Sequence, residues 1–563
     1  MRKQIWMALG VAAVLLLPTW APAAAAAEPP PASSIVWHNC APPPLDIPDG
    51  GQKCGEIDVP LNYQDPRGTH IEVAVSRIAA ANPTKRRGVL LVNPGGPGGS
   101  GLDLPRELSL LMDSAVLDAY DIVGFDPRGV GQSTPLTCGL TALQANQALP
   151  PLMQDHRFSA TATFVHQVAD QCAVDGGQIM PYMNTANTAR DMDQIRRALG
   201  EPKISYLGYS YGTYLGMVYA MLFSQHTDRM VIDSNVDPDW TWREQFNQWG
   251  PAGAARFPDF ARFAAANDAT LHLGATPAAV TNKYYQLSNQ LAAHPLMLPD
   301  GTILNDAFFC EVVFSSLYSD SSFPFLAMLW QELSQPVLPG GAAIQNTLGG
   351  LVGPRPLAGG PTPPLVPVDN PVASGLAVLC NDVAWPRNTA GLPDPAHNVA
   401  SYELDLGLSM AAYPMFGALG RNIWPCAYWK SPPVEPSVQI SGTGPRNILM
   451  IQNVRDPATA YSGAVEARQL LGHRASLVTV QQGGHGAAYL TLSQCASDAA
   501  TRWLVNGLMP PPSGQTCPPP GLTASPHAAL SSEAPTRGAV GPAATSARTT
   551  AIRLIQEVMR PRF

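Results

Sequence analysis

The chain has 563 residues and a formal net charge of −8, and only 13% of its residues are charged. This length allows one large domain with an insertion, or two domains. The sequence has no basic stripe and no acidic block, so we expect neither a nucleic-acid partner nor a polyelectrolyte partner.

The N-terminus has the pattern of a secretory signal peptide. Basic residues at positions 2 and 3 precede an apolar run over residues 5–17, and alanines over residues 23–27 provide a cleavage zone. The apolar run is shorter than the roughly 20 residues of a membrane-spanning helix. We therefore expect residues 1–27 to be removed on export. The mature protein should be secreted, periplasmic or bound to the cell wall, without stable membrane insertion.

The nine cysteines fit an exported protein, because disulfides persist outside the cytoplasm. None lies in a C-x-x-C pair, which argues against a metal or redox site. Spacing alone does not fix the connectivity, but neighbours in the sequence suggest four pairs and leave Cys310 unpaired. The pairs are Cys40 with Cys54, Cys138 with Cys172, Cys380 with Cys426, and Cys495 with Cys517.

Strands are expected over residues 71–75 and 88–92, and the second leads into a glycine-rich loop over residues 93–101. This loop lacks the Lys-Ser/Thr pair of a P-loop and the glycine spacing of a dinucleotide-binding loop, so we assign it no nucleotide. A strand over residues 122–125 and a helix over residues 188–199 follow. Alternating strands and helices predict a parallel sheet with right-handed crossovers.

Residues 208–212 form a G-x-S-x-G motif between a strand over residues 204–207 and a helix over residues 213–220. At such a turn only glycine leaves room on both sides of the serine, whose hydroxyl projects above the sheet. The helix N-terminus favours the negative charge that develops in acyl transfer. Short patterns with two glycines also occur in ordinary turns, but the flanking strand and helix favour Ser210 as a nucleophile.

The alternation of strands and helices ends after a strand over residues 230–233. Residues 241–440 contain helix-like segments and a proline-rich stretch over residues 338–371, which we expect to form long loops. This region is predicted to be a mainly helical cap inserted over the strand ends.

The remaining segments complete the domain organisation. Residues 28–240 and 441–517 are expected to form an α/β core. Residues 518–563 are rich in Pro, Ala, Ser and Thr and predict a disordered, low-complexity tail. Within that tail, residues 550–558 have the pattern of a short amphipathic helix.

A serine nucleophile needs a base, and the base needs a carboxylate, in the chain order Ser, Asp or Glu, His. A strand over residues 447–452 leads to Asp456, and a strand over residues 476–480 leads to His485. Asp456 has an alternative interpretation as a turn former, and His485 as an ordinary loop histidine. His473 is a second candidate base, although its place at a helix end favours a capping role.

The oxyanion of acyl transfer needs two backbone donors. We expect the N–H of Tyr211, which follows the nucleophile, and that of Gly96 in the glycine-rich loop. The other histidines lack metal-ligand spacing, so no metal and no cofactor are expected.

A group of motifs in this chain points to a known family. The motifs lie at residues 93–98, 126–133, 191–199, 208–213, 380–382 and 446–495. Together they resemble the exported tripeptidyl aminopeptidases of bacteria, in the proline-iminopeptidase branch of the α/β-hydrolases. The resemblance extends from about Cys40 to Cys517 and is weak in the insertion. It implies an α/β-hydrolase fold with a mostly parallel central sheet and a large helical cap.

The resemblance implies a secreted serine exopeptidase that releases di- or tripeptides from free N-termini through Ser210, Asp456 and His485. In such enzymes acidic cap residues hold the substrate's ammonium group. No cap motif identifies them here, and the proline-rich segment leaves the cleavage length open. The candidate acids are Asp382, Glu311, Glu244, Asp237 and Glu403.

Two other functions are compatible with the same residues. A carboxylesterase or lipase would use the same triad with an apolar acyl pocket and no ammonium site. A non-catalytic binding protein on a hydrolase fold is a third alternative. The complete set of catalytic residue types argues against it.

Overall fold

The computed structural model contains one sheet of ten strands in the order β1-β2-β3-β5-β4-β6-β7-β10-β11-β12. The structure describes residues 34–42, 47–153, 157–336, 340–352, 366–385, 399–491, 493–519 and 542–559. The expected signal peptide over residues 1–27 lies outside these residues. The strands are β1 (His38–Asn39), β2 (Lys53–Pro60), β3 (His70–Ile78), β4 (Gly88–Asn93), β5 (Tyr120–Phe125), β6 (Ile204–Tyr209), β7 (Thr227–Asp233), β10 (Ile448–Arg455), β11 (Ala475–Gly483) and β12 (Gln515–Cys517).

Neighbouring strands pair in parallel from β5 across to β12, whereas the pairs β1–β2, β2–β3 and β3–β5 are antiparallel. The predicted mostly parallel sheet is confirmed. Strands β4, β5 and β6 are buried along their whole length, as expected for parallel strands covered on both faces. The sheet therefore presents the carboxyl ends of β4, β6, β7, β10 and β11 along one edge.

Two hydrophobic cores cover the two faces of the sheet. Val89 and Leu91 of β4 belong to one core, while Leu90 and Val92 belong to the other, as the two-residue period of a strand requires. Side chains of α5 (Thr185–Ala198), α6 (Tyr211–Leu222) and α17 (Tyr461–Leu471) pack in the first core. Side chains of α1 (Leu104–Ser109), α2 (Ser114–Ala119) and α18 (Gln494–Thr501) pack in the second.

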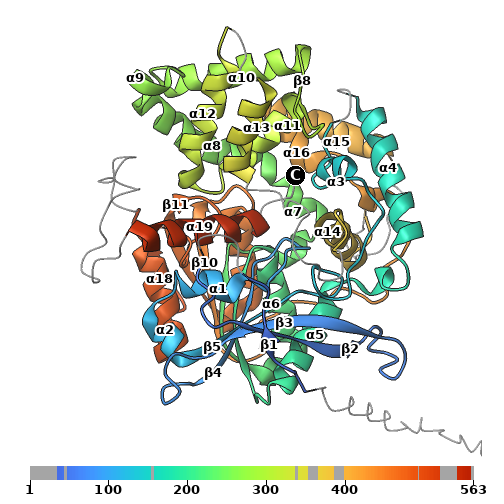
Figure 1. Ribbon diagram of the computed structural model, residues 1–563, viewed down its shortest axis with the longest axis vertical. Helices are drawn as coiled ribbons and strands as arrows, with labels where there is room; N and C mark the ends of the chain where they lie inside the picture. Colours follow the sequence, from blue (N-terminus) through green and yellow to red (C-terminus); the bar gives the residue numbers. More distant parts are fainter. Residues whose placement is uncertain are drawn as a thin grey trace, which may run out of the picture. The chain divides into compact units, whose positions relative to one another are not determined.

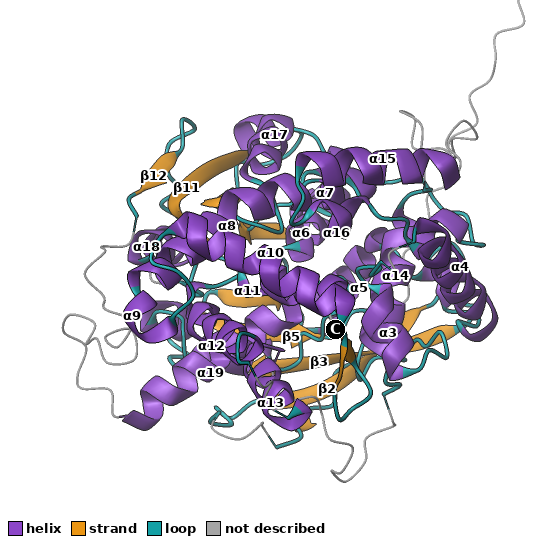
Figure 2. Cartoon of the chain, turned by 90° about the horizontal axis from the view of Figure 1, so that it is seen from above, coloured by secondary structure: helices purple, strands orange, loops and turns teal. Residues whose placement is uncertain are grey.

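Between β7 and β10 the described residues are mainly helical, and we call helices α7 to α16 the cap. In Figure 1 the helices α8 to α13 lie above the strands, and the view from above shows α8 and α10 crossing over them (Figure 2). The cap consists of α7 (Arg243–Asn247), α8 (Trp249–Ala266), α9 (Asp268–Leu271), α10 (Pro277–Ala293), α11 (Asp306–Ser316), α12 (Phe323–Leu333), α13 (Gly341–Val352), α14 (Asn370–Asp382), α15 (Val399–Ala412) and α16 (Gly417–Arg421), with the hairpin β8 (Leu296–Met297) and β9 (Ile303–Leu304).

Two further helices follow β5 in the chain, and short turns of helix connect the other elements. The two helices are α3 (Ala142–Ala148) and α4 (Phe158–Asp175). The short elements are η1 (Met180–Tyr182), η2 (Ser224–His226), η3 (Pro238–Trp240), η4 (Asp320–Ser322), η5 (Pro425–Tyr428), η6 (Gly472–Arg474) and η7 (Arg502–Asn506).

Two expectations of irregular structure are corrected. Part of the proline-rich stretch over residues 338–371 forms α13, because the prolines are absent from residues 341–352 and an apolar face can form there. The tail expected to be disordered includes α19 (Pro542–Met559), which is longer than the short helix expected over residues 550–558. Helix α19 packs against α1 and buries Ile555 and Met559.

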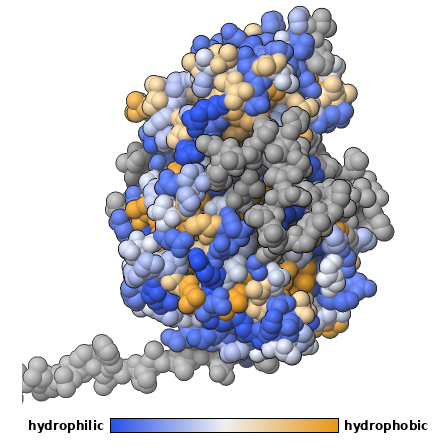
Figure 3. Space-filling model, turned by 90° about the vertical axis from the view of Figure 1, so that its left-hand side faces the viewer, coloured by the Kyte–Doolittle hydropathy of each residue, from blue (hydrophilic) through white to orange (hydrophobic). Residues whose placement is uncertain are grey.

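Hydrophilic residues are interspersed with apolar ones over the described part of the face drawn in Figure 3. No helix among the described residues is long and apolar enough to span a bilayer.

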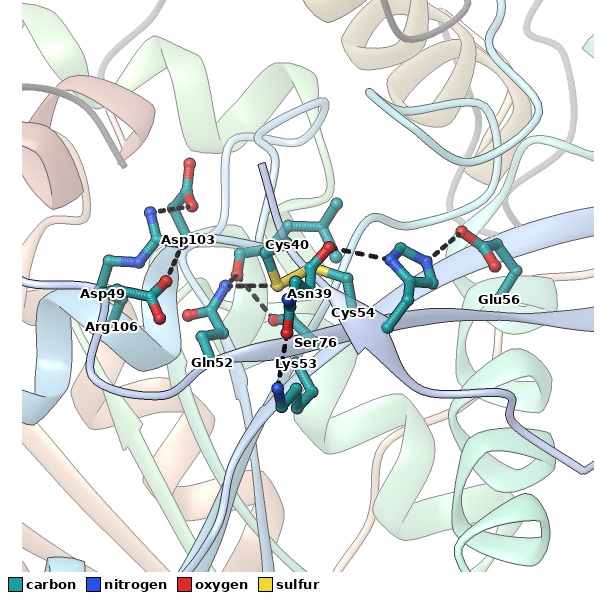
Figure 4. The surroundings of a disulfide bond; sticks show 12 residues. Asn39, Cys40, Asp49, Gln52, Lys53, Cys54, Glu56, Ser76, Asp103 and Arg106 are labelled. Atoms are coloured by element: carbon teal, nitrogen blue, oxygen red, sulfur yellow. Dashed lines mark hydrogen bonds and ion pairs between the residues drawn. A yellow bond between two sulfur atoms is a disulfide. The ribbon is translucent and has the colours of Figure 1, made fainter. Parts of the chain in front are cut away.

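The four predicted disulfide pairs are confirmed. Figure 4 shows Cys40, which follows β1, joined to Cys54 of β2, so that the edge of the sheet is cross-linked. A closed loop of about 15 residues stabilises a fold by about 3 kcal/mol in the chain-entropy treatment. The other pairs are Cys138–Cys172, Cys380–Cys426 and Cys495–Cys517, and Cys310 is a buried free thiol.

Candidate active site

Ser210 occupies a sharp turn between the end of β6 and the start of α6. Its backbone has φ 55° and ψ −125°, a conformation that residues other than glycine rarely adopt. A methyl group on Gly208 would lie 2.5 Å from the carbonyl oxygen of Gly212, and one on Gly212 would lie 2.8 Å from Oδ1 of Asn93. The motif therefore forms the expected tight turn because only glycine fits at its two flanks.

His485 and Asp456 lie together at the same edge of the sheet. Nδ1 of His485 is 2.9 Å from both carboxylate oxygens of Asp456, and both side chains are buried. Nε2 of His485 is buried and has no hydrogen-bond partner among the described residues. With Nδ1–H donating to the carboxylate, Nε2 is the acceptor that can take a proton from a nucleophile.

Asp456 is held by a short turn that follows it. The backbone N–H groups of Ala458 and Thr459 each donate to Oδ1 over 2.9 Å, and the Thr459 hydroxyl donates to Oδ2 over 3.0 Å. The turn-forming role considered for Asp456 therefore coexists with its contact to His485. Thr459 was not among the residues predicted from the sequence, although a hydroxyl residue three positions after an aspartate is a typical partner in such turns.

Asp233, at the end of β7, connects the serine turn to the histidine loop. Its carbonyl oxygen accepts a 3.0 Å hydrogen bond from the N–H of Ser210. Its Oδ2 accepts from the N–H groups of Ala487 and Ala488, at 2.9 and 2.6 Å. Burial raises the pKa of Asp233 to about 7. Asp233 was not among the site residues predicted from the sequence.

The alternative base, His473, lies at the wrong end of its strand. It belongs to the turn η6, which precedes β11, whereas His485 follows β11. Its side chain is exposed. A histidine at the amino end of β11 cannot reach Ser210 at the carboxyl edge of the sheet.

Ser210 lines a pocket of about 690 Å³, part of which is open to solvent. Tyr211 and Gly96, the two expected oxyanion donors, line the same pocket. The loop that carries Gly96 packs against the serine turn, since a methyl group on Gly95 would lie 2.5 Å from the carbonyl oxygen of Tyr209. Aromatic side chains form the cap side of the pocket, and they belong to Trp242, Phe246, Trp249 and Tyr318. Helix α19 contributes one more lining residue, Met559.

Comparison with known proteins assigns this arrangement to a family. The α/β hydrolase fold model matches residues 88–323, and a model described as TAP-like protein matches residues 413–517. The chain is 34% identical over 495 residues to the tripeptidyl aminopeptidase of Streptomyces coelicolor, which covers 84% of each chain. The chain belongs to the tripeptidyl aminopeptidase branch of the α/β-hydrolases. The resemblance seen in the sequence is thus confirmed.

Other members of this branch carry different names. The serine protease Hip1 of Mycobacterium tuberculosis is 29% identical over 511 residues, which cover 86% of this chain and 91% of Hip1. Carboxylesterase B of the same organism is 31% identical over 477 residues, which cover 83% of this chain and 86% of the esterase. The tripeptidyl aminopeptidase branch therefore includes relatives named for peptide and for ester hydrolysis.

Among the acids expected to bind an ammonium group, Asp382 already has three donors. It accepts hydrogen bonds from the N–H and the hydroxyl of Thr185, both at 2.7 Å, and from Nε1 of Trp242 at 3.0 Å. The same Thr185 hydroxyl contacts the Tyr211 hydroxyl at 2.9 Å. Burial raises the pKa of Asp382 to about 6. Asp382 does not line the Ser210 pocket. It instead supports two residues that do: Trp242 directly, and Tyr211 through the Thr185 hydroxyl.

The other candidate acids also lie outside the pocket lining. Glu244 is half-buried on α7, beside the pocket residues Gln245 and Phe246. Asp237 accepts from the N–H of Asp239 and interacts with Glu466, and Glu403 is exposed on α15.

Glu311 differs from the other acids. It is fully buried in α11, and neither of its carboxyl oxygens has a hydrogen-bond partner among the described residues. Burial raises its pKa well above the ordinary glutamate value.

Proposed function

We propose that this protein is an exported serine aminopeptidase that releases di- or tripeptides from free N-termini, with Ser210, His485 and Asp456 as its catalytic triad. One observation carries the proposal. The ring of His485 is fixed by Asp456 through Nδ1, while Nε2 is left without a partner among the described residues, at the edge that carries Ser210. Membership of the family and the four disulfides support an exported hydrolase.

The proposed reaction follows from these positions. Ser210 Oγ attacks the peptide carbonyl while Nε2 of His485 takes its proton, and Asp456 stabilises the imidazolium that forms. The N–H groups of Tyr211 and Gly96 would bind the oxyanion, and each such donor contributes about 2.7–4 kcal/mol. The imidazolium then protonates the leaving amine. Water, activated by His485, releases the acyl peptide.

Glu311 is the best candidate for the residue that binds the substrate's ammonium group. Tyr318, which lines the Ser210 pocket, follows Glu311 by seven residues and lies just beyond the end of α11. An ammonium group would supply the hydrogen-bond partner that Glu311 lacks among the described residues.

A chromogenic tripeptide amide with a free N-terminus, its N-acetylated twin and a short-chain nitrophenyl ester test this proposal. We expect cleavage of the free peptide but not of its N-acetylated twin, with the ester also hydrolysed by the same Ser210, and no cleavage of any of the three by Ser210→Ala. Glu311→Gln should raise KM for the free peptide and leave ester turnover unchanged. Cleavage of the acetylated peptide at an equal rate would contradict an aminopeptidase.

The second candidate function is a carboxylesterase. Among the described residues that line the Ser210 pocket none carries a carboxylate, and the cap side is aromatic. A relative named carboxylesterase B shares 31% identity with the chain. Turnover of the ester with neither peptide cleaved would favour this function.

A further inference from the structure

The cap contacts the candidate base directly. The backbone N–H of His485 donates a 2.8 Å hydrogen bond to the carbonyl oxygen of Tyr318, which follows α11. The two rings meet edge to face, with their centroids 4.8 Å apart. The position of His485 therefore depends on where the cap places the turn over residues 317–320.

Arg256 of α8 fixes that turn. Its Nε donates to the carbonyl oxygen of Leu317 over 3.1 Å, and one of its terminal nitrogens binds the carboxylate of Asp320. These two contacts flank Tyr318 on either side. The Arg256 side chain is only 1% exposed, so this arrangement is screened from water and held in one position.

The same arginine also reaches the strand that carries the catalytic acid. Arg256 pairs with Asp259, and Oδ2 of Asp259 accepts a 2.9 Å hydrogen bond from Nε of Arg455. Arg455 immediately precedes Asp456, and its carbonyl oxygen accepts from the N–H of Gly484 over 3.2 Å. A connected set of bonds thus runs from the cap to the residues next to Asp456 and His485.

Close packing reinforces these bonds. A methyl group on Gly483 would lie 2.3 Å from a terminal nitrogen of Arg256, and one on Gly484 would lie 2.8 Å from the carbonyl oxygen of Tyr318. The histidine loop therefore lies directly against the guanidinium group and the turn that it holds.

We propose that Arg256 is a positioning residue for His485, which it aligns through the turn at Tyr318. Proton transfer by His485 therefore requires that the cap is correctly positioned over the sheet. Arg256 is not among the residues that line the Ser210 pocket. This inference rests on the proposed serine hydrolase function.

The test compares Arg256→Ala with Arg128→Ala. Arg128 is equally buried and pairs with Asp191, but it contacts carbonyl groups of β2 and its neighbours rather than the histidine loop. Both variants should lose thermal stability. Only Arg256→Ala should lower kcat, by about 10- to 100-fold, with little change in KM, because a small displacement of a catalytic group has this effect. Added methylguanidinium should restore part of the kcat of Arg256→Ala.

The rate at which a fluorophosphonate labels Ser210 separates this inference from the proposed function. Wild-type protein that is not labelled, with Ser210→Ala as the blank, would overturn the serine hydrolase function itself. If the wild type is labelled, and folded Arg256→Ala has the same labelling rate and the same kcat as the wild type, only the positioning role is overturned. If Arg256→Ala does not fold, Asp320→Asn takes its place, since Asp320 is 74% exposed and its loss should be tolerated. A several-fold lower kcat at unchanged KM is then expected, and an unchanged kcat would overturn the inference.

Discussion

The hydroxyl group of Thr459 donates a 3.0 Å hydrogen bond to Oδ2 of Asp456, the oxygen that two backbone N–H groups of the same turn leave free. Asp456 is only 2% exposed, so its charge depends on these donors, on the Gln452 side-chain amide and on His485. Through this contact Thr459 would support Asp456 in its proposed role as the catalytic acid.

Replacing Thr459 with valine removes this hydroxyl while keeping the shape of the side chain. A hydrogen bond to a buried charged group contributes about 1.5–3 kcal/mol. We expect Thr459→Val to lower kcat about 10- to 100-fold, and Thr459→Ser to keep most of the activity. Steady-state kinetics on the free tripeptide amide measure both. Equal kcat values for the two variants would contradict a role for the hydroxyl.

The raised pKa of Asp233 predicts that the stability of the folded protein depends on pH. Burial raises its pKa to about 7 in the folded protein, so between about pH 4 and pH 7 the folded state binds more protons than the unfolded state. This stabilisation is present at low pH and is lost as the pH rises through that window. Asp233→Asn cannot ionise, and its Oδ1 can still accept from Ala487 and Ala488.

The melting temperature of Asp233→Asn, relative to wild type, should therefore increase from about pH 4 to about pH 7 and remain constant above that. The free energy involved is at most about 4 kcal/mol, for a pKa that rises from 3.8 to about 7 on folding. Thermal melts of both proteins across this range provide the measurement, and parallel curves would show that Asp233 does not titrate there.

Gly95 is predicted to tolerate no side chain. It has φ +98°, and a methyl group would lie 2.5 Å from the carbonyl oxygen of Tyr209 in the serine turn. Gly51 also has a positive φ, but a methyl group there meets nothing within 4 Å. We expect Gly95→Ala to lose most activity and Gly51→Ala to lose only about 1 kcal/mol of stability. Similar activities in the two variants would contradict the close packing of the loop on the serine turn.

The free thiol of Cys310 should be unreactive in the folded protein. Burial raises its pKa to about 12, so almost no thiolate exists near neutral pH. With nine cysteines and four disulfides, one thiol remains (9 − 8 = 1). A thiol titration with Ellman's reagent should detect none before and one after denaturation. Rapid reaction of the native protein would show that this part of the cap opens.

The sequence predicts the elements of this fold where local signals are strong. The apolar run at residues 88–92 is β4 because a strand covered on both faces needs apolar residues throughout. By contrast β2 alternates buried and exposed residues and contains glycine and proline, and it was missed. The chain order of serine, aspartate and histidine identified the three residues at the carboxyl edge, since each one follows a recognisable strand.

Residues that act through long-range contacts could not be predicted in the same way. Asp233 is separated by 254 residues from Ala487, whose N–H it binds, and no local pattern marks such a pair. The candidate acids show the same limit. Asp382 and Glu311 are both buried, but only the fold reveals that the first has three donors and the second has none among the described residues.

Helix α19 contributes one residue to the wall of the pocket that contains Ser210. Met559, the last residue of this helix, lines the pocket. An affinity tag or a reporter joined directly after Met559 would therefore begin at the pocket wall. Kinetic constants measured with such a fusion would include competition between tag and substrate, whereas a tag on the amino-terminal side of β1 would leave this wall in its natural state.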